Sequence, residues 1–249
     1  MVGGLGNQLY QFSYAYYVFK QLGFKKLVIH ISDMNNYNEN WGLLINKILN
    51  IEGNKEIIIS SKKINITKLR LPKILCKFIT KLPNRISLIG DKNADKYYKL
   101  SESNIIIIDG YFEKTYIKNS GLKYIKSLIK DGIYDEKYKR FNVVNIRGGE
   151  YARLGLSKDS DIEFYIDSIK KIKPTAENNK WIVVTDDKYY AEKILKGIDI
   201  KYEIAEPDPI KNFSIVLSSS YKILSRSTFS KWAGALSQEE CTCFFLDPF

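Results

Sequence analysis

Phe141-Asn142-Val143-Val144-Asn145-Ile146-Arg147-Gly148-Gly149 is the stretch that sets the fold class of this chain. Its apolar residues predict a strand over Phe141–Arg147, after which two glycines bend the chain. Working outward, the spacing of apolar residues predicts a helix over Ile162–Ile172 and a second strand over Lys180–Thr185. A strand, a helix and another strand in succession indicate a parallel βαβ unit, and therefore an α/β fold.

The same alternation continues along the rest of the chain. Further strands are predicted over Lys26–Ile31, Glu56–Ser60, Asn104–Asp109, Lys201–Ile204 and Tyr221–Ser225, and further helices over Gln8–Leu22, Lys188–Lys196, Lys211–Ser218 and Ser227–Ser237. The charged, turn-prone stretch Asp131–Arg140 separates two halves that both show this pattern. We therefore expect two Rossmann-like halves that face a cleft, residues 1–135 and residues 136–249.

Composition excludes several classes of protein. The 249 residues are 45% hydrophobic and 27% charged, which is typical of globular proteins, and no apolar run reaches membrane-spanning length. A single histidine, His30, excludes a multi-histidine metal site, and three cysteines make neither a disulfide framework nor a zinc site. Because the first residues lack the pattern of a secretory signal, we expect a cytoplasmic protein.

The charge of the chain indicates an anionic partner. Lys and Arg number 39 against 28 Asp and Glu, a formal net charge of +11, and such a surplus favours polyanions. Residues Leu71–Leu82 predict a basic amphipathic helix, which fits either a peripheral contact with an anionic membrane or a solvated helix face. Nucleic acid is not expected, because the sequence has no Arg-rich arm, zinc finger or RNP-type strand.

Two glycine-rich segments suit phosphate or sugar binding. In Gly3-Gly4-Leu5-Gly6-Asn7-Gln8 the glycines let backbone amides approach a ligand at a helix start, although the third glycine of a dinucleotide fingerprint is missing. Arg147 stands at the end of a strand beside Gly148 and Gly149. A guanidinium group there suits a phosphate, because it is always charged and donates paired hydrogen bonds; a surface ion pair with Glu150 is the alternative.

Two further segments carry polar residues at the junction of a strand and a helix, where α/β proteins bind ligands. Asp186 and Asp187 follow an apolar strand, and metal binding, helix capping and contact with a guanine base all fit them. The segment Ser225-Arg226-Ser227-Thr228-Phe229-Ser230 places four hydroxyl groups at a helix start, which is an arrangement that favours phosphate.

These segments, in this order, resemble the motifs of the bacterial α-1,2-fucosyltransferases and of the wider fucosyltransferase superfamily. The opening loop of that family matches Gly3–Gln11 without a gap, and its later motifs resemble Gly110–Glu113, Asn145–Tyr151, Thr185–Asp187 and Ser225–Ala233. The resemblance implies a GT-B-type α/β fold, with an acceptor-side N-terminal half and a donor-binding C-terminal half.

The resemblance also implies a reaction. It is an inverting transfer of L-fucose from GDP-L-fucose to a sugar hydroxyl, expected to be O2, in a bacterial surface polysaccharide or O-antigen. No metal or other cofactor is implied. The partners are then the GDP-sugar donor and a glycan acceptor, for which a lipid-linked form would suit an enzyme at the inner face of the cytoplasmic membrane.

Functional roles of the family fall on matching positions. Arg147 matches the arginine that contacts the donor diphosphate, and Asn7 matches the loop at the junction of donor and acceptor. Asp187, ahead of Asp186, matches the acidic contact to guanine. The implied donor-binding set is Gly4, Leu5, Gly6, Asn7, Asn145, Arg147, Arg153, Asp186, Asp187, Ser227, Thr228 and Phe229. For the general base that deprotonates the acceptor, Glu150 is the first candidate, ahead of Asp159 and Asp161.

Three positions of the arginine motif depart from the family pattern: its histidine is Asn145 here, its second arginine is Gly148, and its aspartate is Glu150. In the last motif, Arg226 and Lys231 replace an asparagine and a tryptophan and add positive charge. Arg153 is the candidate to supply the missing charge. The departures leave open a transferase for another GDP-deoxyhexose such as colitose, and a non-catalytic GDP-sugar-binding protein. A metal-dependent transferase that uses Asp186 and Asp187 is a further alternative.

Overall fold

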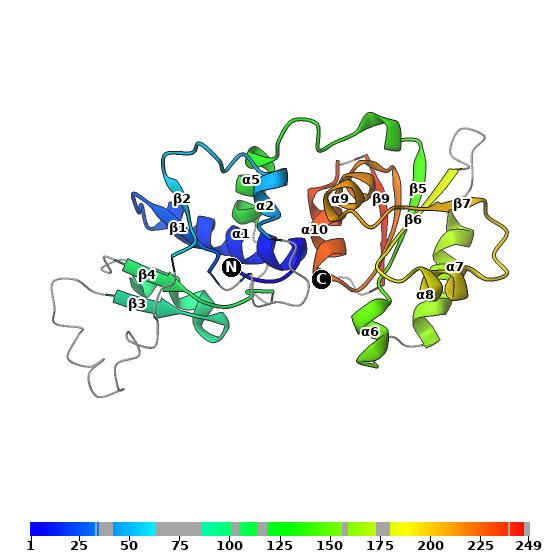
Figure 1. Cartoon of the computed structure of the whole chain (residues 1–249), viewed down its shortest axis with the longest axis horizontal. Coiled ribbons are helices and arrows are strands. Elements are labelled where there is room, and N and C mark those ends of the chain that lie inside the picture. The colour runs from blue at the N-terminus through cyan, green and yellow to red at the C-terminus, as the bar shows by residue number, and fades with distance from the viewer. Residues whose placement is uncertain are drawn as a thin grey trace. The chain divides into compact units, whose positions relative to one another are not determined.

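The chain folds into two compact α/β units, Met1–Lys130 and Asp131–Phe249, in a computed structural model (Figure 1). The structure describes residues 1–32, 34, 42–62, 86–100, 105–113, 119–155, 159–172, 180–238 and 240–246. The basic helix expected over Leu71–Leu82 lies outside the described residues, as does Cys76. No helix in the described part of the chain has the length and apolar character needed to cross a membrane.

The first unit is built on a long helix and two small parallel sheets. Its elements are α1 (Leu5–Gln21), β1 (Leu27–His30), α2 (Ile45–Ile48), β2 (Ile57–Ser60), β3 (Ile86–Ile89), the 3-10 segment η2 (Asp91–Leu100), β4 (Ile105–Ile108) and α5 (Asn119–Leu128). Strand β1 pairs with β2, and β3 pairs with β4. Helix α1 buries Leu9 and Phe12, and Tyr16 packs edge-on against Tyr124 of α5 at 5.7 Å between ring centroids.

The second unit contains one five-stranded parallel sheet. Its strands are β5 (Phe141–Ile146), β6 (Lys180–Thr185), β7 (Tyr202–Ile204), β8 (Tyr221–Leu224) and β9 (Thr242–Phe245), in the spatial order β7-β6-β5-β8-β9. Its helices are α6 (Gly149–Arg153), α7 (Asp159–Lys171), α8 (Lys188–Leu195), α9 (Pro209–Ser218) and α10 (Thr228–Leu236), preceded by the 3-10 turn η3 (Glu136–Tyr138). This is the order of a Rossmann-like sheet. From β5 the chain adds β6 and β7 on one side, and then crosses to add β8 and β9 on the other side.

Helices cover both faces of this sheet. Val144 and Ile146 of β5 join Val183 and Ile223 in a buried cluster with residues of α7 and α8. Because side chains alternate along a strand, the neighbouring positions face the other way, toward α9 and α10. There the space beside Gly234 of α10 is filled by Phe245 and Leu224. The βαβ unit predicted from the sequence is therefore confirmed.

Several elements differ from the sequence prediction. Strands β3 and β9, helices α2, α5 and α6, and the 3-10 segments η2 and η3 are additional to those predicted. Helix α1 begins at Leu5 rather than at Gln8, because Gly3 takes the left-handed conformation (φ 83°) and Gly4 is extended (φ −71°, ψ 177°), which turns the chain directly into the helix. Leu5, Gly6 and Asn7 are therefore residues of the first helical turn.

Candidate functional site

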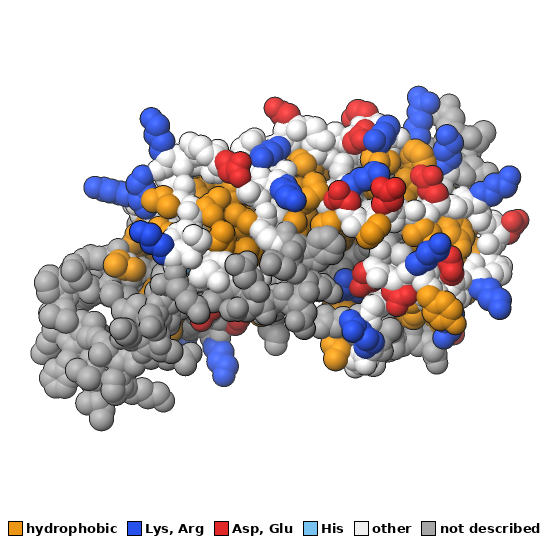
Figure 2. All heavy atoms as spheres, viewed as in Figure 1, with side chains coloured by type: hydrophobic (Ala, Val, Ile, Leu, Met, Phe, Trp, Pro, Cys, Tyr) orange, Lys and Arg blue, Asp and Glu red, His pale blue; other side chains and the backbone are white. Residues whose placement is uncertain are grey.

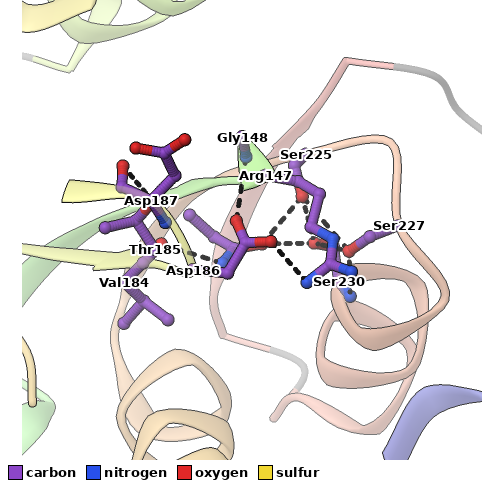
Figure 3. A network of polar contacts seen from close by, with 10 residues as sticks. Arg147, Gly148, Val184, Thr185, Asp186, Asp187, Ser225, Ser227 and Ser230 are labelled. Carbon is purple, nitrogen blue, oxygen red and sulfur yellow. Dashed lines mark hydrogen bonds and ion pairs between the residues drawn. The ribbon is translucent and has the colours of Figure 1, made fainter. Parts of the chain in front are cut away.

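Polar side chains gather at the carboxyl ends of β5, β6 and β8 (Figure 3). The sheet order reverses between β5 and β8, and in open α/β sheets ligands bind outside the strands at such a point. The structure thus brings together three of the predicted segments, those that contain Arg147, Asp186 and Ser227.

Asn145 is the centre of a buried hydrogen-bond network. Its amide nitrogen donates to the carbonyl oxygen of Val184 (3.0 Å), and its Oδ1 accepts from Ser225 (2.9 Å) and from Ser230. Tyr165 of α7, whose burial raises the pKa of its hydroxyl, donates to the carbonyl of Asn145 at 3.3 Å. With 6% of its surface exposed, Asn145 ties three strands to α10, so it positions the site from within.

The hydroxyl groups at the start of α10 bind mainly to one another. Ser230 Oγ lies 2.7 Å from both Ser225 Oγ and Ser227 Oγ. Ser227 is the N-cap of α10 and accepts a hydrogen bond from the Ser230 amide at 3.1 Å. Thr228 follows in the first turn, and Phe229 packs edge-on against Phe213 of α9 at 5.3 Å. The buried serines therefore build the helix N-terminus, which attracts anions through its amides.

Arg147 and Asp186 form an ion pair just beyond β5 and β6. Arg147 Nη1 lies 2.7 Å from Asp186 Oδ2, and the Gly148 amide donates to Asp186 Oδ1 at 2.9 Å. The two side chains are 32% and 28% exposed. The ring of Tyr151 lies 5.8 Å from Arg147 Cζ. One guanidinium and one backbone amide thus hold the two oxygens of a single anion, which is the contact that a phosphate group also accepts.

Asp187 caps α8, so one of the interpretations left open by the sequence is observed. Its Oδ1 accepts from the Tyr190 amide at 2.9 Å, and its own amide donates to Thr185 Oγ1 at 3.0 Å. No group of three or more His, Cys, Asp or Glu side chains among the described residues is placed to hold a metal ion.

The glycines after Arg147 are enclosed by the start of α8. A Cβ atom on Gly148 would lie 2.7 Å from Tyr190 Cδ1 and 2.8 Å from Asp187 Cβ. A Cβ on Gly149, where φ is 27°, would lie 2.5 Å from Asp186 Oδ2. An arginine at position 148 would therefore displace the start of α8, which is a physical reason for the departure from the family motif.

The remaining charged candidates are placed differently. Arg226 pairs with Asp161 of α7 at 3.2 Å, and the Asp161 side chain is only 8% exposed. Because its carboxylate is nearly buried and paired with Arg226, Asp161 is a poor candidate for a general base. Arg153 is exposed at the end of α6. Glu150 lies in α6, and its side chain, like that of Asp159, lies outside what the structure describes.

In the first unit, Gln8 fixes the glycine turn. Its Nε2 donates to the carbonyl oxygens of Gly3 (2.8 Å) and Gly42 (2.9 Å), and its Oε1 accepts from the amides of Leu44 (2.8 Å) and Ile45 (3.3 Å). All four hydrogen-bonding positions of this buried side chain are therefore used. The Leu5 side chain is also buried, so only the backbone of Leu5 can contact the GDP-sugar.

A second motif in this unit holds a strained backbone. Phe112 has a φ of 60°, and its amide donates to Asp91 Oδ1 at 2.5 Å while the Tyr111 amide donates to Asp91 Oδ2 at 3.1 Å. The Phe112 ring stacks on Tyr14 at 4.2 Å. A non-glycine residue in this conformation persists only where its surroundings hold it. The role of Asp91 was not predicted, because this residue stands far from the motif Gly110–Glu113 in the chain.

Comparison with known proteins agrees with the resemblance drawn from the motifs. The sequence matches the profile of glycosyl transferase family 11 over residues 4–245. It is 24% identical, over 258 residues, to the alpha-1,2-colitosyltransferase of Escherichia coli, and the alignment covers 95% of this chain and 86% of that protein.

Among solved structures, the chain is similar to the fucosyltransferase NodZ from Bradyrhizobium, with a TM-score of 0.59, 14% identity, and coverage of 94% of this chain and 89% of that one. A structure of POFUT1 in complex with GDP gives a TM-score of 0.48 at 12% identity, over 98% of this chain and 95% of that one. The likeness to NodZ confirms the GT-B-type α/β fold; the roles of the two halves and the cleft between them stay predictions.

The family profile runs from the glycine turn at the start of α1 to the last strand of the five-stranded sheet. It therefore spans the family-like motifs of this chain, apart from Gly3 at the start of the opening loop. This chain belongs to glycosyltransferase family 11.

Proposed function

We propose that the chain is an inverting transferase that moves L-fucose from GDP-L-fucose to a hydroxyl group of a glycan. The expected acceptor position is O2 of a sugar in a bacterial surface polysaccharide or O-antigen. Family membership supports the sugar transfer, and the motif pattern supports the GDP-linked donor. In this reaction the bond between the sugar and the diphosphate is broken, so the site must stabilise the diphosphate that leaves.

The ion pair between Arg147 and Asp186 is the observation that carries this proposal. The guanidinium group and the Gly148 amide hold two carboxylate oxygens at 2.7 and 2.9 Å, and two oxygens of a diphosphate can replace them. Negative charge grows on the diphosphate as the sugar leaves. A fixed positive charge at that place stabilises the transition state more than the ground state, which is the requirement for catalysis.

The placement of the two aspartates supports a transfer that needs no metal. Asp186 is bound to Arg147 and to a backbone amide, and Asp187 caps α8. A metal bridge between the carboxylates would have to compete with both sets of contacts. Arg147 and the amides at the start of α10 supply positive potential instead, at the carboxyl ends of β5 and β8.

The acceptor hydroxyl must lose its proton as it attacks the sugar. Glu150 remains our candidate for the general base, because it follows Arg147 by three positions at the start of α6. Asn7, in the first turn of α1, is the candidate that orients the hydroxyl.

GDP-colitose is a second candidate donor, because a family relative that is 24% identical over most of both chains is named as a colitosyltransferase. Colitose is L-fucose without the hydroxyl at carbon 3. Comparison of kcat/KM for GDP-L-fucose and GDP-colitose with the same acceptor therefore decides between them. A site that hydrogen-bonds the 3-hydroxyl would reject colitose by a large factor, since its polar group would be left unpaired.

Replacement of Arg147 tests the catalytic proposal. Arg147→Ala is expected to lower kcat/KM by on the order of 100-fold or more, and to weaken GDP binding, because it removes the charge that faces the leaving group. The matched control is Arg140→Ala, which removes an exposed arginine before the opposite end of β5. Near-normal turnover in Arg147→Ala, measured with folded protein, would refute the role.

Calorimetric titration with GDP, UDP and NAD, each with and without EDTA, separates the alternatives. Binding of GDP that is unaffected by EDTA, with no UDP or NAD binding, is the expected result. A preference for UDP that requires a metal would favour the metal-dependent alternative instead. Tight GDP binding without transfer or donor hydrolysis on any acceptor tried would favour a non-catalytic GDP-sugar-binding protein.

A further inference from the structure

Two cysteines and a buried lysine lie together on the second unit, toward the amino ends of β8 and β9. Lys222 of β8 is paired in register with Cys243 of β9, and Cys241 directly precedes that strand. The candidate donor site lies at the opposite, carboxyl end of β8. The proposed sugar transfer uses none of these three side chains.

The two sulfur atoms are close enough to react with one another. Cys241 Sγ lies 3.6 Å from Cys243 Sγ, and both cysteines are partly exposed. Side chains two positions apart in an extended segment point to the same side, which explains the proximity. A disulfide bond is about 2.05 Å long, so a shift of about 1.5 Å between the two sulfurs closes the bond.

Lys222 makes this pair unlike two ordinary surface thiols. Its side chain is completely buried, its Nζ donates to the carbonyl oxygen of Ser219, and it shares a hydrogen bond with Cys241. No carboxylate in the described part of the chain forms an ion pair with it. A buried ammonium group is costly without an opposite charge, and a thiolate on Cys241 supplies that charge.

The protonation of the two thiols is unequal. The hydrogen bond that Cys243 donates, followed by the charge of Lys222, lowers the pKa of Cys241, and Ser237 at the end of α10 also contributes. The same hydrogen bond raises the pKa of Cys243, and burial lowers that of Lys222. Cys241 is therefore the nucleophile, and Cys243 holds the proton beside it.

We propose that Cys241 and Cys243 form a reversible disulfide by exchange with a low-molecular-weight disulfide such as glutathione disulfide. The Cys241 thiolate attacks one sulfur of that disulfide, which gives a mixed disulfide and releases one thiolate. The released thiolate takes up the proton of Cys243, and the Cys243 sulfur then attacks Cys241 and expels the second thiolate, which takes a proton from water. Two protein thiols are oxidised, and one disulfide is reduced to two thiols.

The test uses the full chain with Cys76→Ser, which leaves Cys241 and Cys243 as the only thiols of its sequence. The protein is equilibrated in glutathione redox buffers, alkylated, and mapped by peptide mass spectrometry. The intramolecular disulfide is expected to accumulate as the buffer becomes more oxidising, and to disappear on addition of dithiothreitol. With Cys243→Ser as well, a glutathione adduct is expected to persist on Cys241.

The lysine is tested through the rate of reaction. Lys222→Met keeps an unbranched buried side chain without charge, and is expected to slow disulfide formation at neutral pH by about tenfold or more. The pH profile of Cys241 alkylation tests the lowered pKa of this thiol as a whole: its midpoint is expected below that of free glutathione. Two free thiols in the most oxidising buffer, or a midpoint at or above that of glutathione, would overturn the proposal.

Discussion

Single side chains at the candidate site have two tasks, to hold the structure and to receive a ligand. Asn145 and Ser230 are occupied by buried contacts with one another and with neighbouring strands. Arg147 and Asp186 are each about one third exposed and are paired with one another. A ligand can displace the exposed pair at moderate cost, whereas displacement of the buried network would leave polar groups unsatisfied. The replaceable contacts are thus those of Arg147.

Asp186 is expected to compete with the donor for Arg147. Asp186→Asn keeps an oxygen that accepts from the Gly148 amide, but it removes the negative charge beside the guanidinium group. GDP should then bind more tightly, by up to about fivefold, because a partly exposed ion pair is worth at most about 1 kcal/mol. Calorimetry measures the change.

The control for this variant is Glu206→Gln, which removes an exposed carboxylate that pairs with Lys211 in the same unit. Weaker GDP binding in Asp186→Asn than in the control would contradict the prediction. It would instead support the acidic guanine contact that the family resemblance allows for Asp186.

The elements of the second unit are joined at the site by contacts between residues that are distant in the chain. Arg226, between β8 and α10, pairs with the buried Asp161 of α7. Helix α7 is thereby attached to the loop that starts α10. The pair has a structural task, whatever further use the positive charge of Arg226 has near a phosphate.

Loss of this attachment is expected to destabilise the second unit. Arg226→Ala removes the ion pair of a nearly buried carboxylate. It should lower the free energy of unfolding by about 2 kcal/mol, less than for a completely buried pair because Arg226 is partly exposed. Urea denaturation measures this. Lys211→Ala, which breaks an exposed ion pair with Glu206, should change it by less than about 0.5 kcal/mol. Equal effects of the two substitutions would disprove the structural role.

The sequence predicted strongly apolar elements better than partly exposed ones. Strands β5 and β6 are buried over almost all their length, so most of their residues are apolar. Strand β9 begins with Thr242 and Cys243, and its exposure pattern is that of an edge, so its pattern is weak. Arg147, Asp186 and Asp187 were predicted as site residues for a related reason, because they directly follow strands of mostly apolar residues.

The partners of the site residues were not predictable in this way. Ser230 reaches Asn145 across 85 positions of the chain, and Asp91 reaches the amide of Phe112 across 21. Nothing local in a sequence indicates such a pairing, because it depends on how strands are ordered in the sheet. The roles of Gln8 and Asp91 in holding backbone turns were missed for the same reason.

At the scale of the whole molecule, the positive net charge is the feature that suggests a partner. The formal net charge is +11, yet on the face that Figure 2 shows, basic and acidic side chains are interspersed. The peripheral contact with an anionic membrane stays a prediction from the sequence, and it rests on the basic segment Leu71–Leu82, which lies outside the described residues.

Sedimentation with lipid vesicles tests this contact. The protein is expected to bind vesicles rich in phosphatidylglycerol at low salt and to be released by added salt, but not to bind phosphatidylcholine vesicles. Each basic residue near an anionic surface contributes about 1 kcal/mol to such binding, and salt screens this attraction. The pair Lys73→Glu and Lys77→Glu should abolish binding. The control pair Lys123→Glu and Lys126→Glu changes the net charge equally on exposed positions of α5, and should leave most of the binding intact.

The order of strands in the second unit also determines when that unit can fold during synthesis. Its central strand, β5, pairs with β6 and with β8, and the edge strand β9 follows only at Thr242–Phe245. As the chain leaves the ribosome, β5 therefore lacks its partner β8 until Tyr221–Leu224 has been synthesised. Pairings between distant segments form slowly, and exposed apolar strands aggregate while they wait. The yield of active protein will thus be limited by the second unit, and co-expressed chaperones or slower translation at low temperature should raise it.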